Sequence, residues 1–425
     1  MKIIKSIFFT ASFLINILHT QSQTRQEVES QIITYSEFIK QVAENNLEYA
    51  AEKFNVSLAE AEIDVAKIIP DVELGLEGGS NNKSMGNSME IGLGWTIELG
   101  GKRKARINLA KSEVELNKYL LQNFYNNLRA DATLLYLQTL QNKQLLDVQK
   151  RSYDMLEQLA KSDSLRYKLG VIAHIDARQS KFEAQSMLNE IYEAETEWQN
   201  SIINLSLVMG KSQTDQWWMT EGDLNKFDRN FDLSQLITTA QNNRADAMAG
   251  IQNVKVSEEM LKLANANRIM DLGISAGLQL NGKATNEEAP SPYHTGVVAG
   301  LNIPLRFLNN RKGEKKIAEY TIQKSNLEYK QIELQIQTEI TQAYNNYNTS
   351  QKQVKQFKDH LLKQAEEILK GKMYSYQRGE TSLLELLDAQ RTHNDVQKSY
   401  YETIFNYASS LIELERVSGI WDIEF

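Results

Sequence analysis

Cysteine is absent from the 425-residue sequence, and this absence excludes disulfide bonds, thiolate metal sites, iron–sulfur clusters and cysteine nucleophiles. Histidine is scarce: the chain has five, and no two of them have the spacing of an HExxH or ExxH metal site. The glycine-rich phosphate-binding motifs are missing as well. We therefore expect no metal centre and no cofactor, and we do not expect an enzyme.

Positive charge is in deficit. The sequence has 47 lysine and arginine residues against 55 aspartate and glutamate residues, which gives a formal net charge of -8. An excess of negative charge repels the phosphate backbone of DNA and RNA. We therefore expect no nucleic-acid partner.

A hydrophobic run long enough to span a bilayer is also missing. The most apolar stretch, Ile7 to Leu18, is shorter than the roughly 20 residues that a transmembrane helix needs. Because Lys2 and Lys5 precede this stretch and polar residues follow it, residues 1–22 are interpreted as a secretory signal peptide. A short N-terminal membrane anchor is the alternative. Export of a protein without cysteine favours a bacterial envelope.

Proline and glycine are confined to two short windows. The four prolines lie in or beside residues 70–101 and 271–312, as do most of the glycines. Residues 102–169 and 314–370 contain neither residue type, so each stretch could form one uninterrupted helix, of roughly 100 and 85 Å. Helices of that length predict coiled-coil-like packing rather than a compact globule.

Inside both windows the side chains alternate with the period of a β-strand. Around Leu74, Leu93, Ile274 and Val297, apolar residues alternate with glycine, glutamate, serine or other small and polar residues. This pattern predicts two β-hairpins, at 71–99 and 271–305, each with one apolar face and one small or polar face.

The chain contains an internal repeat. Residues 151–210 align without gaps on 360–419, and further upstream Ala110 pairs with Ala318 and Tyr136 with Tyr344. We therefore predict two structural repeats, 23–232 and 233–425. Each is expected to have a helix, a hairpin, a very long helix, a glycine turn and a further helix. Residues 211–232 form the connector, in which Trp217 and Trp218 are interpreted as local packing.

Four strands per chain are too few to close a transmembrane barrel, whose minimum is about eight. Several chains would have to pool their strands. The alternative is a sheet half covered by helices in a soluble protein, but that alternative does not explain the very long helices.

The predicted order of elements resembles that of the TolC-like outer membrane efflux channels. Individually weak motifs carry the resemblance, namely Asn45–Glu48 (NNLE), Asn242–Asp246 (NNRAD), Ile97–Arg106 (IELGGKRKAR) and Gly379–Gln390 (GETSLLELLDAQ). The resemblance implies a mainly α fold with a small β part, in which three chains form a twelve-stranded barrel and an α-helical tunnel. It also implies location in the outer membrane, in contact with its lipid, and extension into the periplasm. The implied partners are a periplasmic adaptor, or membrane fusion protein, and an RND-type inner membrane pump.

The resemblance also implies site residues at the two glycine turns. The positions that would dock on the adaptor are Leu169, Gly170, Val171, Arg378, Gly379 and Glu380. The alternative is that both glycines only end helices in the left-handed conformation.

A periplasmic gate is implied near these turns, at Glu385, Asp388, Asp176 and Tyr376. The chain departs from the family pattern at Thr381, which replaces a gate arginine, and Arg378 is the candidate substitute. The alternative for the carboxylates is an ordinary solvated helix face.

The substrate is implied only at the level of a class. The stretches 98–106 and 387–391 look most like those of the branch that serves heavy-metal pumps of the cobalt-zinc-cadmium and copper type. Lumen-side acidic residues, predicted at Glu73, Glu77, Glu90 and Glu98, would suit cations, although any water-filled pore can be acidic. Drug export, type I protein secretion and a non-channel structural or adhesive coiled-coil protein are the alternatives.

Overall fold

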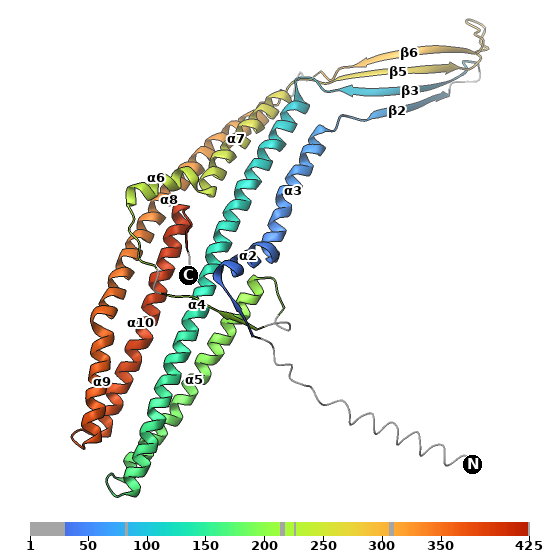
Figure 1. Ribbon diagram of the computed structural model, residues 1–425. Coiled ribbons are helices and arrows are strands. Elements are labelled where there is room, and N and C mark those ends of the chain that lie inside the picture. Colours follow the sequence, from blue (N-terminus) through green and yellow to red (C-terminus); the bar gives the residue numbers. More distant parts are fainter. Residues whose placement is uncertain (1–29, 81–83, 213–216, 225–226, 306–309, 424–425) are drawn as a thin grey trace, which may run out of the picture.

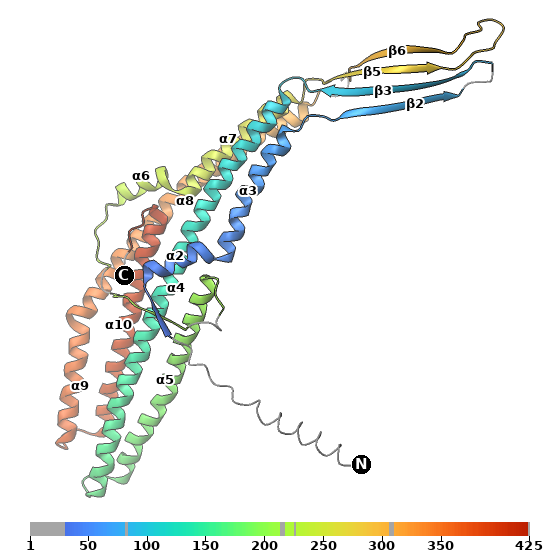
Figure 2. The ribbon, with the colours of Figure 1, turned by 45° about the vertical axis from the view of Figure 1, so that its right-hand side comes forward.

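The computed structural model describes residues 30–80, 84–212, 217–224, 227–305 and 310–423, so the predicted signal peptide lies outside the described residues. A long helical body carries a four-stranded sheet that projects from one end (Figures 1 and 2). The mainly helical fold with a small β part is therefore confirmed.

The helices of the two halves follow the same order. In the first half they are α2 (Tyr35–Asn45), α3 (Leu47–Lys67), α4 (Lys102–Lys168) and α5 (His174–Val208). In the second half they are α6 (Leu233–Asn243), α7 (Ala245–Ala266), α8 (Lys312–Gln356), α9 (Leu362–Gln377) and α10 (Leu383–Ser418). The α4 helix spans almost the whole 102–169 stretch, because nothing in that stretch breaks a helix.

Each half begins with two helices where the sequence predicts one. The break falls at Asn46 and Arg244, whose backbone is extended, with ψ of 123° and 134°. Asn46 also caps α3, since its side-chain oxygen accepts a hydrogen bond from the Tyr49 amide at 2.9 Å.

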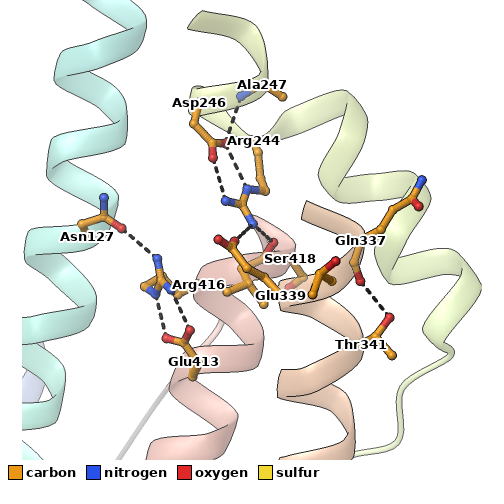
Figure 3. A network of polar contacts seen from close by, with 12 residues as sticks. Asn127, Arg244, Asp246, Ala247, Gln337, Glu339, Thr341, Glu413, Arg416 and Ser418 are labelled. Carbon is orange, nitrogen blue, oxygen red and sulfur yellow. Dashed lines mark hydrogen bonds and ion pairs between the residues drawn. The ribbon is translucent and has the colours of Figure 1, made fainter. Parts of the chain in front are cut away.

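These two break residues make equivalent contacts in the two halves. The Asn46 amide donates to the Val208 carbonyl oxygen at 2.9 Å, and the Arg244 guanidinium donates to the Val417 carbonyl oxygen at 2.9 Å. Figure 3 shows how Arg244 also pairs with Asp246. Each contact joins the start of α3 or α7 to the end of α5 or α10, so the repeat has a matching joint in each half.

The predicted uninterrupted helix of the second half contains a π turn, η1 (Phe357–Leu361), between α8 and α9. Comparison of the two repeats explains why the π turn forms. Ala110 aligns with Ala318, whereas Arg151 aligns with His360, so the second half has gained one residue between these points. A π turn accommodates one extra residue without ending the helix.

The hairpins form one antiparallel sheet with the strand order β2–β3–β5–β6. The strands are β2 (Val72–Ser80), β3 (Asn87–Ile97), β5 (Leu272–Asn281) and β6 (His294–Asn302). The last strand ends before the predicted Leu305, since Pro304 has no amide hydrogen to donate.

The register of the sheet separates two faces. Directly opposed residues point to the same side of a sheet, and the register aligns Leu74, Leu93, Ala276 and Ala299 in one row. The neighbouring row consists of Glu73, Gly94, Ser275 and Gly300. One face is therefore apolar across all four strands and the other is small or polar.

The apolar face of the sheet is not covered by the described part of the chain. Val297 is 82% exposed and Leu301 73% exposed. In the described part of the chain, the edge strands β2 and β6 are each paired on one side only. An apolar face of this extent requires a partner other than water.

A small parallel sheet ties the connector to the chain start. Strand β1 (Ser30–Ile33) pairs with β4 (Trp217–Thr220). Trp218 is buried in the main apolar core and Trp217 packs against it, as the local-packing interpretation predicts.

Two buried tyrosines hold the connector against the long helices. The Tyr136 hydroxyl lies 2.7 Å from the Glu221 carbonyl oxygen. The Tyr347 hydroxyl lies 2.8 Å from the Phe227 carbonyl oxygen and accepts a hydrogen bond from the Arg229 amide at 2.8 Å. The counterpart of Tyr136 in this role is therefore Tyr347, one turn after the sequence-aligned Tyr344, which is only partly buried.

We expect Tyr347→Phe to lower the free energy of unfolding by roughly 1–3 kcal/mol, because the change removes the hydrogen-bonding partner of buried connector groups. Tyr344→Phe is the matched control and should change stability much less. Urea unfolding of both variants, followed by circular dichroism, checks this. Equal effects at the two positions would contradict the assignment of Tyr347.

Candidate functional site

The end of the helical body opposite the sheet is formed by two helix turns (Figure 1). One joins α4 to α5 through Gly170, and the other joins α9 to α10 through Gly379. Both glycines have a positive φ, of 73° and 78°. An added Cβ would meet nothing within 4 Å at either position, so the constraint is the left-handed backbone rather than space.

The side chains at the first turn point away from the chain's own core. Leu169 is 69% exposed and Val171 is 62% exposed. At the second turn, Arg378 pairs with Glu380 at 2.9 Å and donates to the Tyr374 hydroxyl at 2.9 Å. The predicted docking residues thus form two exposed turns at one end of the molecule, and docking itself stays a prediction.

A buried polar contact joins the two helix pairs close to the turns. The Tyr376 hydroxyl on α9 donates to Asp163 Oδ1 on α4 at 3.0 Å. Asp163 is fully buried, and among the described residues its second oxygen, Oδ2, has no hydrogen-bond partner. The Arg166 guanidinium lies 3.6 Å from Asp163 Oδ1 and 4.9 Å from the Tyr376 ring centre.

Electrostatics bring a further predicted residue into this cluster. Burial raises the pKa of Asp163, and the Asp176 carboxylate acts in the same direction. Burial and the Asp163 carboxylate raise the pKa of Tyr376. Tyr376 and Asp176, both predicted from the sequence, therefore lie around an acidic group, Asp163, that sequence reasoning missed. The only local signal was the Asp163–Arg166 spacing of three residues on one helix face.

Glu385 lies in the first turn of α10. It pairs with Lys372 at 2.6 Å and accepts a hydrogen bond from the Thr381 hydroxyl at 2.7 Å. The hydrogen bond from Lys372, followed by the one from Thr381, lowers the pKa of Glu385 to about 2. Ser382 caps the same helix, because its hydroxyl oxygen accepts a hydrogen bond from the Glu385 amide.

The cation that neutralises Glu385 is therefore Lys372 and not Arg378. Within one chain the Arg378 guanidinium is held by Glu380 and Tyr374, and its role as the substitute for the missing gate arginine stays a prediction. Asp388, one turn further along α10, is exposed and makes no hydrogen bond or ion pair in the described part of the chain.

Further contacts hold the two helix pairs side by side. Arg391 on α10 pairs with Glu183 on α5 at 2.8 Å, and Lys398 on α10 pairs with Glu190 on α5 at 3.0 Å. A buried apolar cluster lies beneath them, which contains Leu156, Ala160, Ala184, Met187, Leu369, Tyr376, Leu383, Leu386, Leu387 and Ala389. The two turns therefore form one end surface.

Three of the four predicted acidic lumen residues share the polar face of the sheet. Glu77 lies opposite Glu90, and Glu73 lies opposite Gly94. Glu98 does not lie on this face, because β3 ends at Ile97. It forms a bidentate ion pair with Arg106 on α4. The charge of Glu98 is therefore neutralised at the sheet–helix junction.

The same junction explains the basic stretch after β3. Arg103 donates to the Lys67 carbonyl oxygen at 2.7 Å, and Arg106 donates to the Ile68 carbonyl oxygen at 3.0 Å. These arginines cap the C-terminal end of α3, where the helix dipole favours positive charge.

Within residues 30–423, less the undescribed gaps, no helix is apolar enough over a sufficient length to cross a membrane. No group of three or more histidine, aspartate or glutamate side chains in that same part is arranged to hold a metal ion.

Comparison with known proteins gives consistent matches. The profile of the family described as outer membrane efflux protein matches residues 38–211 and 236–420, one segment in each half. The cobalt-zinc-cadmium resistance protein CzcC of Cupriavidus metallidurans is 23% identical over 377 residues, which are 87% of this chain and 88% of that protein.

The fold is similar to that of solved structures. A membrane protein from Pseudomonas aeruginosa has a TM-score of 0.74 at 15% identity, with 90% of this chain and 93% of that chain covered. The CmeC outer membrane channel of Campylobacter jejuni has a TM-score of 0.72 at 13% identity, with 90% and 85% covered. For CusC the TM-score is 0.73 at 16% identity, with 91% and 92% covered.

We expect Tyr376→Phe to loosen the contact between the two helix pairs, because it leaves the buried Asp163 without its hydrogen-bond donor. Tyr374→Phe, which removes an exposed hydroxyl on the same helix, is the control. Spin labels on cysteines introduced at the exposed Lys168 and Gln377 report the distance between the turns. A distance distribution that is equally narrow in wild type and Tyr376→Phe would contradict this role.

Proposed function

The chain belongs to the outer membrane efflux protein family, and from this premise we propose that three copies assemble into one export duct. The protein is an outer membrane efflux channel that extends into the periplasm. Membership of the family favours a channel over the alternative of a structural or adhesive coiled-coil protein.

The sheet supports assembly from several chains. A membrane supplies no hydrogen bonds for the backbone groups of a strand edge, so sheets within it must close. Strands β2 and β6 each have one unpaired edge in the described part of the chain, and pairing β6 of one copy with β2 of the next would close the ring. Three copies would supply twelve strands, which exceeds the minimum of about eight.

The helical body supports the same head-to-tail assembly. Near the sheet, α3 packs on α4, α4 on α7 and α7 on α8, so α3 and α8 lie at opposite edges (Figures 1 and 2). Both edges carry exposed apolar side chains, on α3 Leu47, Phe54, Leu58 and Val65 and on α8 Ile317, Tyr320, Leu327 and Leu334. Different surfaces that complement each other generate a closed ring when the rotation between copies allows it.

The periplasmic end is proposed to dock on an adaptor protein that connects it to an RND-type inner membrane pump. The support is the pair of exposed turns around Gly170 and Gly379. Leu169 and Val171 expose apolar surface there that none of the described residues covers.

The entrance of the duct is proposed to lie at the same end. The Tyr376–Asp163 contact would hold the helix pairs together in the closed state, and Asp176, Glu385 and Asp388 would supply acidic groups around the axis. Since Lys372 neutralises Glu385, Asp388 would carry the uncompensated charge. Three such carboxylates around one axis attract cations.

Heavy-metal cations are the proposed substrate class. The support is the similarity to a protein named for cobalt, zinc and cadmium resistance, together with Glu73, Glu77 and Glu90 on one face of the sheet. Because these acidic side chains would line a water-filled lumen, they favour the passage of cations over anions.

Conductance of the purified protein in a planar bilayer tests the proposal. We expect stepwise currents, and we expect Zn²⁺ added on the side of the turns to block them. Asp388→Ala should relieve the block more than Glu385→Ala, because Glu385 is already paired with Lys372. Glu73→Gln, in the sheet, is the matched control and should leave the block unchanged.

The absence of any conductance would contradict a channel. Conductance with a block that Asp388→Ala leaves unaltered would contradict the assignment of the entrance alone.

A further inference from the structure

Arg129 lies in the middle of α4 and is half-buried. Its Nε atom is buried without an acceptor, and in the described part of the chain its guanidinium makes no hydrogen bond or ion pair. Burial lowers the pKa of Arg129. The Glu415 carboxylate acts on Arg129 through its charge, but a desolvated cation without a hydrogen-bonded anion is unfavourable in a folded protein.

The neighbouring Arg416 shows the usual arrangement. Its guanidinium reaches α4 at Asn127, at 3.1 Å, and it forms two hydrogen bonds with Glu413, at 2.6 and 2.7 Å. The hydrogen bond to Glu413 raises the pKa of Arg416, the direction opposite to that of Arg129. Among the described residues, a carboxylate is hydrogen-bonded to Arg416 but none is hydrogen-bonded to Arg129.

Aromatic rings hold the Arg129 guanidinium in place. Its central carbon lies 4.1 Å from the ring centre of Trp421 and 5.7 Å from that of Tyr125. A guanidinium that stacks on a ring keeps its N–H groups in its own plane, where they can bind both oxygens of a carboxylate. The stacking therefore orients Arg129 without using its hydrogen-bond donors.

Arg129 lines a cavity of about 840 Å³, which is within the usual range for small-molecule sites. The remaining lining residues are mostly aromatic, apolar or hydroxyl-bearing, among them Tyr35, Tyr125 and Trp421, and two are acids, Glu221 and Asp223. They come from the start of α2, from α4, from the connector and from the C-terminal segment. The cavity therefore lies where the two halves of the repeat meet.

We propose that this cavity binds a ligand with a single carboxylate on an apolar or aromatic body, with the carboxylate on Arg129 and the body against Trp421 and the tyrosines. Glu221 and Asp223 line the same cavity, and their negative charges oppose an anion in proportion to its charge, so a second negative charge on the ligand adds to the repulsion. A monocarboxylate is therefore favoured over a phosphate. The site is separate from the turns and from the sheet, so it does not depend on the proposed export mechanism.

Calorimetric titration of the full-length protein in detergent tests the proposal, with N-acetyl-L-phenylalanine as the probe. N-acetyl-L-phenylalaninamide is the neutral control and should bind at least about tenfold more weakly, because hydrogen bonds to a charged group are lost. Arg129→Gln should weaken binding of the acid by a similar factor. Arg178→Gln, at an exposed arginine of α5, is the matched control and should leave binding unchanged.

Equal binding of the acid and the amide to the wild-type protein, or no binding of either, would overturn the proposal, and this comparison needs no variant to fold. Unchanged binding of the acid to a folded Arg129→Gln protein would overturn the role of Arg129. Competition by inorganic phosphate at the same concentration as the acid would contradict the preference for a single charge.

Discussion

The structure depends on one constraint: a four-stranded sheet with a continuous apolar face, and with two edges that no described strand pairs, cannot be stable alone in water. Its register places apolar residues in complete rows across β2, β3, β5 and β6. The helices cannot cover that face, because they extend away from the end of the sheet (Figure 1). The apolar face therefore requires lipid and the edges require further strands, and the membrane location and the proposed ring both follow from these two needs.

The internal repeat determines how the helices are connected to that sheet. Each half supplies one hairpin and one pair of long helices, and each half uses the same joint, in which Asn46 or Arg244 binds the end of the last helix. The halves are not identical, since the second has a π turn and Arg244 forms additional ion pairs with Asp246 and Glu339. The two turns at the end opposite the sheet also differ, since Leu169 and Val171 flank Gly170 whereas Arg378 and Glu380 flank Gly379.

The features that could be predicted from the sequence are those carried by local patterns. Alternation predicted the strands around Leu74 and Leu93, and the lack of glycine and proline predicted α4. Contacts between distant residues could not be predicted in this way. Tyr376 meets Asp163, and Arg129 meets Trp421, only because α4, α9 and the C-terminal segment pack together. The Lys372–Glu385 pair likewise forms only because the helix turn brings α9 against α10.

Cross-linking between neighbouring copies tests the central claim most directly. Because the chain has no cysteine of its own, only the introduced cysteines can form a disulfide. One cysteine would replace Leu76 on β2, and a second would replace in turn Thr295, Val297, Ala299 or Leu301 on β6. Within one chain these strands are separated by two others, or roughly 14 Å at about 4.8 Å per strand, which is too far for a disulfide. The account predicts that oxidation of outer membranes gives covalent trimers for at least one pair. Monomers alone at all four pairs, or covalent dimers without trimers, would contradict it.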